Sequence, residues 1–174
     1  MKNPYREYIE FANFLADEAS KTSMQYFRTK FNINDKEDMS PVTIADKNTE
    51  LKIRELINDK YPDHGILGEE LDAYNVNSEF VWVVDPIDGT RSFIAGHKDF
   101  GNLISLTHNQ KPILGIINCP AHNERWIGIK NEQTVYNNKK AKTSSISRIE
   151  DAYLFMSGLY FDEPILKKGV EKIT

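Results

Sequence analysis

The stretch Val81-Trp82-Val83-Val84-Asp85-Pro86-Ile87-Asp88-Gly89-Thr90 decides how this chain folds. Its first four residues are apolar, which predicts a strand that is buried on both faces. Pro86 has no N–H group, so we expect the hydrogen-bonded ladder of the strand to stop there. Asp88 is then the expected cap of a short helix over residues 90–95. The two carboxylates would lie on one rigid turn that faces the N–H groups of a helix start. Such a turn suits divalent cations next to a phosphate.

Length and composition describe an ordinary globular chain. The 174 residues are 40% hydrophobic and 28% charged, with a formal net charge of −4, which suffices for one domain with a buried core. The mildly acidic balance, without a basic run, argues against a nucleic-acid partner. No apolar run has the length of a membrane span or the form of a signal peptide. The single cysteine, Cys119, fits a reducing cytosol. We therefore expect one cytoplasmic domain, residues 1–174, that contacts neither membrane nor nucleic acid.

Two helices are predicted upstream of this stretch. Residues 4–27 place apolar side chains at three- and four-residue steps, with acidic residues on the opposite face. A second helix is expected from a cap at Thr43 to about residue 60, where Tyr61-Pro62 ends it. Between the helices, residues 31–39 predict a loop or an irregular hairpin. The second helix is expected to bury Ala45, Leu51, Ile53, Leu56 and Ile57.

Runs of strand-forming residues separated by turn residues make up most of the remaining chain. The expected strands are residues 65–70, 81–84, 100–108, 112–119, 124–129 and 134–136, and residues 152–156 could start one more. Those that follow residue 96 predict an antiparallel meander. The sequence therefore predicts an α+β fold, a layered α-β sandwich in which two N-terminal helices pack on a mostly antiparallel sheet.

Four carboxylates form a candidate metal site: Asp46, Glu69, Asp85 and Asp88. Hard oxygen ligands favour magnesium, manganese or calcium over zinc, and the four histidines lack a metal-binding spacing. Simpler explanations stay open, since Asp46 could only complement a helix dipole and Glu69 could be solvated charge. Taken together beside a helix start, the acids predict a site that binds a phosphate monoester. A cation held there would lower the pKa of the water that attacks phosphorus.

Other residues of the same turn have candidate roles. The backbone carbonyl of Ile87 is a further possible metal ligand. Thr90 could share a proton with Asp46 and so orient the attacking water. Gly89 would let a phosphate approach the backbone closely, where helix N–H groups would bind its oxygens.

Three motifs in this order resemble those of the inositol monophosphatase superfamily of magnesium-dependent, lithium-sensitive phosphatases. The similar stretches are residues 40–46, 68–70 and 82–90. The resemblance implies two or three Mg²⁺ ions, with Mn²⁺ as a substitute and Li⁺ as an inhibitor, and a homodimer. It also implies a role for each matched residue. Glu69, Asp85 and the carbonyl of Ile87 would bind one metal, Asp85 and Asp88 would bind the second, and Glu70 would lie in an outer shell or at a third metal. The implied catalytic residues are Asp46, Thr90 and Glu69, and the implied substrate-binding residues are Gly89, Thr90, Asp88 and Arg91.

Within the superfamily, residues 91–96 and 123–126 are most similar to the histidinol-phosphate phosphatase branch, although Arg91 and Trp126 could equally be packing or surface residues. The expected substrate is therefore histidinol phosphate, and the alternative is inositol 1-phosphate or a related sugar or nucleotide phosphate. Family members usually continue into a second half with a Trp-Asp motif, and no such motif follows Asp88 here. This departure favours a fragment that lacks one acid of the second metal site. A fragment of that kind could instead be a non-catalytic metal-binding or interaction module.

Overall fold

The computed structural model describes residues 3–29, 33–35 and 41–153. Residues 1–142 form one compact unit and residues 143–174 form another, and each is described by itself. Within the described part of the second unit, the only regular element is a short 3-10 helix, η2 (Ile149–Asp151).

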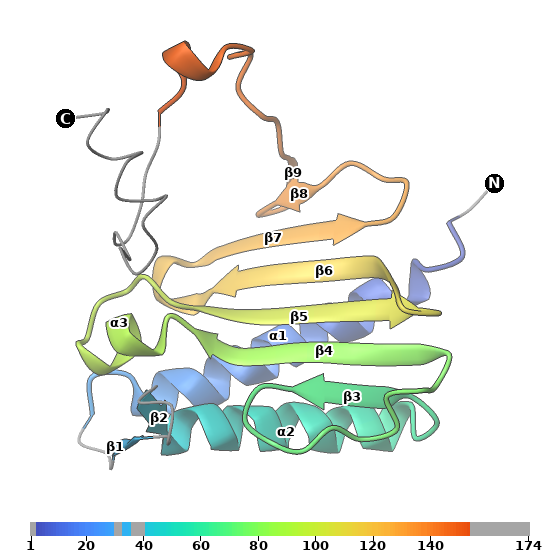
Figure 1. Cartoon of the computed structure of the whole chain (residues 1–174), viewed down its shortest axis with the longest axis vertical. Coiled ribbons are helices and arrows are strands. Elements are labelled where there is room, and N and C mark those ends of the chain that lie inside the picture. The colour runs from blue at the N-terminus through green and yellow to red at the C-terminus, as the bar shows by residue number, and fades with distance from the viewer. Residues whose placement is uncertain (1–2, 30–32, 36–40, 154–174) are drawn as a thin grey trace, which may run out of the picture. The chain divides into compact units, whose positions relative to one another are not determined.

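The described part of the first unit is built on a seven-stranded sheet (Figure 1). Its strands follow each other in the order β3 (Gly65–Gly68), β4 (Phe80–Asp88), β5 (Gly101–His108), β6 (Lys111–Cys119), β7 (Glu124–Ile129), β8 (Val135–Tyr136) and β9 (Lys139–Lys140). The β3–β4 pair is parallel and every other neighbouring pair is antiparallel. The predicted layered α+β fold with a mostly antiparallel sheet is confirmed.

Two long helices, α1 (Glu7–Tyr26) and α2 (Ile44–Lys60), lie side by side on one face of this sheet (Figure 1). α1 packs against β4, β5 and β6, and α2 packs against β4. The core between the layers is apolar, as expected where a helix stripe faces the inward positions of a sheet. Its fully buried side chains include Leu15, Ile53, Ile57, Trp82, Ile104 and Leu106.

Short elements complete the first unit. β1 (Ile33–Asp35) and β2 (Pro41–Thr43) form an antiparallel pair, so the predicted irregular hairpin is present. α3 (Thr90–Ile94) follows β4 directly, and a 3-10 helix, η1 (Pro120–His122), connects β6 to β7. No helix within the described ranges combines the length and the apolar composition needed to cross a membrane.

Three local predictions are wrong. Leu51 is 52% exposed, because it lies about 160° around α2 from the buried Ile53. Asp88 ends β4 and does not cap α3; the cap position is Gly89, which has no side chain that could cap the helix. β4 also continues past Pro86, because a bulge absorbs the missing donor.

The possible strand at 152–156 is not present at residues 152 and 153, and its other residues lie outside the described part.

The second face of the sheet is less covered than the sequence predicts. Val83 is only half-buried, and Ile117 on the same face is 52% exposed. Both side chains line a depression of about 640 Å³, together with Leu103 and Trp126. The depression reaches the predicted site residues Glu69 and Asp85 at one end of the sheet.

Candidate active site

The predicted acids are brought together by the parallel pairing of β3 and β4. Gly68 pairs with Val84, so the residues that follow them, Glu69 and Asp85, come out at the same edge of the sheet. Asp88 ends β4, and Asp46 lies in the first turn of α2. All three other carboxylates are close enough to Asp85 to perturb its titration.

Asp85 is the most perturbed group of the site. Burial raises the pKa of its carboxyl to about 7, and the negative charges of Glu69, Asp88 and Asp46 add to the increase. Its Oδ1 atom is buried and has no hydrogen-bond partner among the described residues. A buried carboxylate oxygen without a donor is costly, and a cation would satisfy it.

A bulge in β4 shapes the turn that carries these acids. The register of the β4–β5 ladder shifts between Asp85 and Asp88, so Pro86 and Ile87 together oppose the single residue Asn102. The side chain of Ile87 is buried in a small cluster with Ala45, Phe93 and Phe100. Apolar packing therefore anchors the middle of the turn, while the two acids flank it.

Gly89 and Thr90 connect this turn to α3. Gly89 has φ +85°, and a Cβ atom there would lie 2.9 Å from the backbone oxygen of Asp99, so a side chain would be strained for both reasons. The Oγ1 atom of Thr90 lies 3.4 Å from Oδ1 of Asp46 and 3.0 Å from the carbonyl oxygen of Ile87. The structure thus places Thr90 against the residue with which it was predicted to share a proton.

A buried ion pair holds the neighbouring Glu69–Glu70 turn, and sequence reasoning missed it. Glu50 of α2 is fully buried, receives a hydrogen bond from Nε of Arg54 at 2.8 Å, and accepts another from the backbone N–H of Glu70 at 2.8 Å. Arg54 also donates to the carbonyl oxygen of Leu71 at 3.0 Å. The available signal was a glutamate on the apolar stripe of the helix, one turn before Ile53 and Arg54.

Arg91 and Trp126, which could be packing or surface residues, have different surroundings. Arg91 is exposed on α3. Trp126 lies on the less covered face of the sheet and packs against Tyr136, with their ring centroids 4.7 Å apart. The predicted substrate contact of Arg91 stays a prediction.

The chemistry of the donor set suits a hard divalent cation. The carboxylates of Glu69, Asp85 and Asp88 and the carbonyl of Ile87 are all oxygen donors, and the orphaned Oδ1 of Asp85 lies among them. Within residues 3–29, 33–35 and 41–153, no three Asp, Glu, His or Cys side chains already enclose a metal position. The residues therefore fit the expected metal by ligand type and charge.

A recess of about 480 Å³ adjoins Asp88. Its polar lining includes three carboxylates, from Asp88, Asp99 and Glu124, and the imidazole of His122. His122 and Asp99 form an ion pair with an Nε2–Oδ1 distance of 3.0 Å when the imidazole is protonated. No lysine or arginine lines the recess within the described residues, so it favours a ligand that carries positive charge.

Comparisons with known proteins agree with this geometry. A bifunctional phosphatase IMPL2 (chloroplastic) of Arabidopsis thaliana is 41% identical over 163 residues, covering 92% of this chain and 47% of that protein. A histidinol-phosphatase of Chlorobaculum parvum is 38% identical, covering 80% of this chain and 54% of that protein. The solved structure of an inositol monophosphatase from Zymomonas mobilis superposes with a TM-score of 0.71 at 41% identity, covering 83% of this chain and 56% of that one.

The chain thus spans about half the length of the curated relatives it matches. The model of the inositol monophosphatase family matches residues 5–165, which includes every predicted site residue. This chain therefore belongs to the inositol monophosphatase family.

Proposed function

We propose that this site hydrolyses a small phosphate monoester with the help of Mg²⁺. The observation that carries the proposal is Asp85, a half-buried carboxyl whose pKa is raised to about 7 and whose buried Oδ1 atom has no hydrogen-bond partner among the described residues, beside three further acids. Glu69, Asp85, Asp88 and the carbonyl of Ile87 would hold the metal. When bound, Mg²⁺ would neutralise charge on the phosphate and lower the pKa of the attacking water.

Thr90 and Asp46 would supply the proton transfer. The hydroxyl of Thr90 lies 3.4 Å from the carboxylate of Asp46, so it can pass a proton toward that carboxylate while its oxygen accepts one from water. Asp46 is 98% covered by protein, which keeps it from being screened by solvent. Because Gly89 has no side chain, a phosphate oxygen could approach the backbone of this turn.

As substrate we propose histidinol phosphate, which pairs a phosphate with an amine and an imidazole. The acidic recess beside Asp88 suits these cationic groups better than it suits the uncharged hydroxyls of inositol. The proposal also draws on the name of the histidinol-phosphatase of Chlorobaculum parvum. Inositol 1-phosphate is the competing substrate. We also propose a homodimer, which the family resemblance implies, and a cytoplasmic location, which the composition favours.

Phosphate release from histidinol phosphate and from inositol 1-phosphate, with and without Mg²⁺, tests this function. We expect Mg²⁺-dependent release that is faster with histidinol phosphate. Because the relatives are about twice as long, the assay should include any longer natural form of the protein. Absence of release from every small monoester in both forms would contradict the proposal, and faster release from inositol 1-phosphate would reassign the substrate.

Substitution of Thr90 tests the proton transfer within the same assay. Thr90→Ala should lower kcat by about 100-fold, because general acid–base catalysis contributes roughly that factor or more. Thr90→Ser keeps the hydroxyl and is the matched control, so it should retain most of the activity. If Thr90→Ala and Thr90→Ser behave alike, the hydroxyl does not move the proton.

A further inference from the structure

We infer that Arg125 positions the metal-binding turn from three strands away, through a relay formed by the side chains of Asn118 and Asn102. This inference rests on the proposed function, because it takes the Asp85–Asp88 turn to be the metal site. Each strand contributes one member in a single row across the sheet. Arg125 on β7 pairs with Asn118 on β6, Asn118 pairs with Asn102 on β5, and Asn102 opposes the bulge of β4.

The relay ends at the bulge of β4, where Asn102 binds the backbone. The ladder shifts register at Pro86, and Pro86 itself offers no N–H group to the neighbouring strand. The side-chain Nδ2 of Asn102 donates to this carbonyl at 2.7 Å. The carbonyl of Pro86, which lies in the turn between the two acids, therefore takes side-chain support from Asn102, on the face of the sheet that α1 covers.

The two asparagines lie inside the protein, where an unpaired amide is expensive. Asn102 is 0% exposed and Asn118 is 3% exposed. Nδ2 of Asn118 donates to Oδ1 of Asn102 at 2.9 Å and to Oγ of Ser20 at 2.8 Å. Oδ1 of Asn118 in turn accepts from Nε of Arg125 at 2.9 Å. Each side chain thus hydrogen-bonds to the next, and the row of hydrogen bonds is continuous from Arg125 to the carbonyl of Pro86.

Arg125 fixes the direction of the whole row. A guanidinium can only donate hydrogen bonds, so the oxygen of Asn118 must face it. The amide nitrogen of Asn118 then faces Asn102, which must present its oxygen there and its nitrogen to the Pro86 carbonyl. An asparagine can otherwise turn its amide over with almost no change in shape. Arg125 at one end, which can only donate, and the carbonyl of Pro86 at the other end, which can only accept, remove that freedom.

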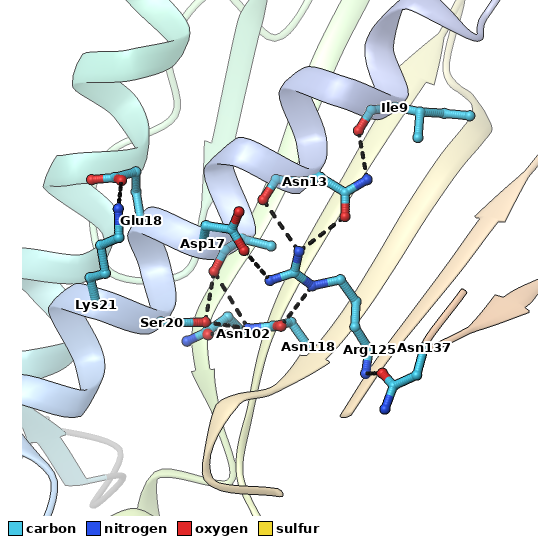
Figure 2. A network of polar contacts seen from close by, with 11 residues as sticks. Ile9, Asn13, Asp17, Glu18, Ser20, Lys21, Asn102, Asn118, Arg125 and Asn137 are labelled. Atoms are coloured by element: carbon cyan, nitrogen blue, oxygen red, sulfur yellow. Dashed lines mark hydrogen bonds and ion pairs between the residues drawn. The ribbon is translucent and has the colours of Figure 1, made fainter. Parts of the chain in front are cut away.

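Helix α1 holds Arg125 in this orientation (Figure 2). The two remaining guanidinium nitrogens donate to Oδ1 of Asn13 at 3.0 Å and to Oδ1 of Asp17 at 2.7 Å. Figure 2 shows the guanidinium between the helix on one side and Asn118 on the other. All three nitrogens are engaged, so the side chain has one geometry rather than several.

Loss of Arg125 should therefore loosen the metal-binding turn. Without the guanidinium, the buried oxygen of Asn118 loses its charged donor, and the amide of Asn118 is no longer held in place against Asn102 from this side. Groups that orient metal ligands from outside typically change metal affinity by 10–100-fold when they are removed. We expect Arg125→Met to weaken divalent-metal binding by about tenfold.

Mn²⁺ titration followed by electron paramagnetic resonance tests this effect. Arg125→Met is compared with Asn118→Asp, which keeps an acceptor for Arg125 but can no longer donate to Asn102. Both variants make the chain more negative, so simple charge attraction would strengthen Mn²⁺ binding. The relay instead requires about tenfold weaker binding in both. Arg6→Met is the matched control, because Arg6 forms a similar two-point pair with Glu132 that does not reach the site.

A second readout separates this inference from the proposed function. The backbone amide resonances of residues 85–90, measured by nuclear magnetic resonance without metal, should shift in Arg125→Met and in Asn118→Asp but not in Arg6→Met. If the parent chain binds no Mn²⁺, the proposed metal site fails and the amide shifts alone decide whether the relay exists. Unmoved amide resonances, or unchanged Mn²⁺ affinity in a chain that binds Mn²⁺, would overturn the relay. A lower free energy of unfolding with unchanged affinity would reveal a structural role only.

Discussion

Asp85 carries a free-energy cost in the metal-free chain that grows with pH. Its pKa is about 7 in the folded chain and 3.8 for an ordinary aspartate, so the folded chain binds the proton more tightly than the unfolded chain. The stability from the protonated carboxyl is present below pH 3.8 and is lost as the pH rises to about 7. The pKa of His64 is also shifted, because burial lowers it, so the pH dependence of the whole chain has more than one source.

The difference between the parent chain and Asp85→Asn isolates this contribution. Urea unfolding with a chelator, at pH values across this range, should show a free energy of unfolding that falls with pH more steeply in the parent chain. Asp85→Asn should fold normally and be the more stable of the two at pH 7, because repulsion with Glu69 is gone. Equal pH dependence in both chains would mean that Asp85 ionises as a solvated carboxyl does.

Gly68 leaves room for the buried carboxylate of Glu50. A Cβ atom at this position would overlap that carboxylate, whose own hydrogen bonds prevent it from moving away. Gly68→Ala should therefore lower the free energy of unfolding by about 2 kcal/mol, as overpacking does elsewhere. Gly115→Ala is the control, since a Cβ there meets nothing within 4 Å, and its effect should stay within about 0.5 kcal/mol. Similar losses for both would refute the steric account.

Helix α2 stabilises the fold and also holds the Glu69–Glu70 turn. Glu50→Ala would leave Arg54 without its buried partner and the N–H of Glu70 without an acceptor. We expect a loss of about 3–5 kcal/mol in the free energy of unfolding, as for other broken buried pairs. Glu55→Ala removes the partner of Lys52 in an exposed pair of the same helix and should change nothing measurable. Chemical denaturation of both variants gives the comparison, and equal losses would contradict it.

Elements with a clear hydrophobic period could be predicted from the sequence. The β-bulge and the buried polar side chains, which interrupt that period, could not. Both long helices and the meander follow from spacing alone, because burial imposes that spacing. The bulge in β4 was missed because Pro86 indicates equally a strand end and a bulge. Asn102 and Asn118 look like surface residues in the sequence, since their partner Arg125 is distant along the chain. Polar groups that satisfy each other across strands leave no periodic signal.

The site follows from the way the first unit is layered. With both long helices on one face, the sheet edge at the ends of β3 and β4 gathers acids from three separate motifs. The sequence located these acids because each follows a recognisable strand or helix start. It does not define the substrate, because the recess beside Asp88 combines residues from the α3–β5 connection, η1 and β7. Such a combination depends on tertiary packing, which no local pattern records.

Binding of Mg²⁺ to the chain, measured by isothermal titration calorimetry, tests the central claim most directly. The claim is that Glu69, Asp85 and Asp88 hold a divalent cation at this sheet edge. We predict saturable binding by the parent chain and at least about tenfold weaker binding by Asp85→Asn. Asp99→Asn, which removes a carboxylate from the neighbouring recess only, should bind as the parent chain does. A parent chain that does not bind Mg²⁺, or an Asp85→Asn chain that binds it equally well, would contradict the account.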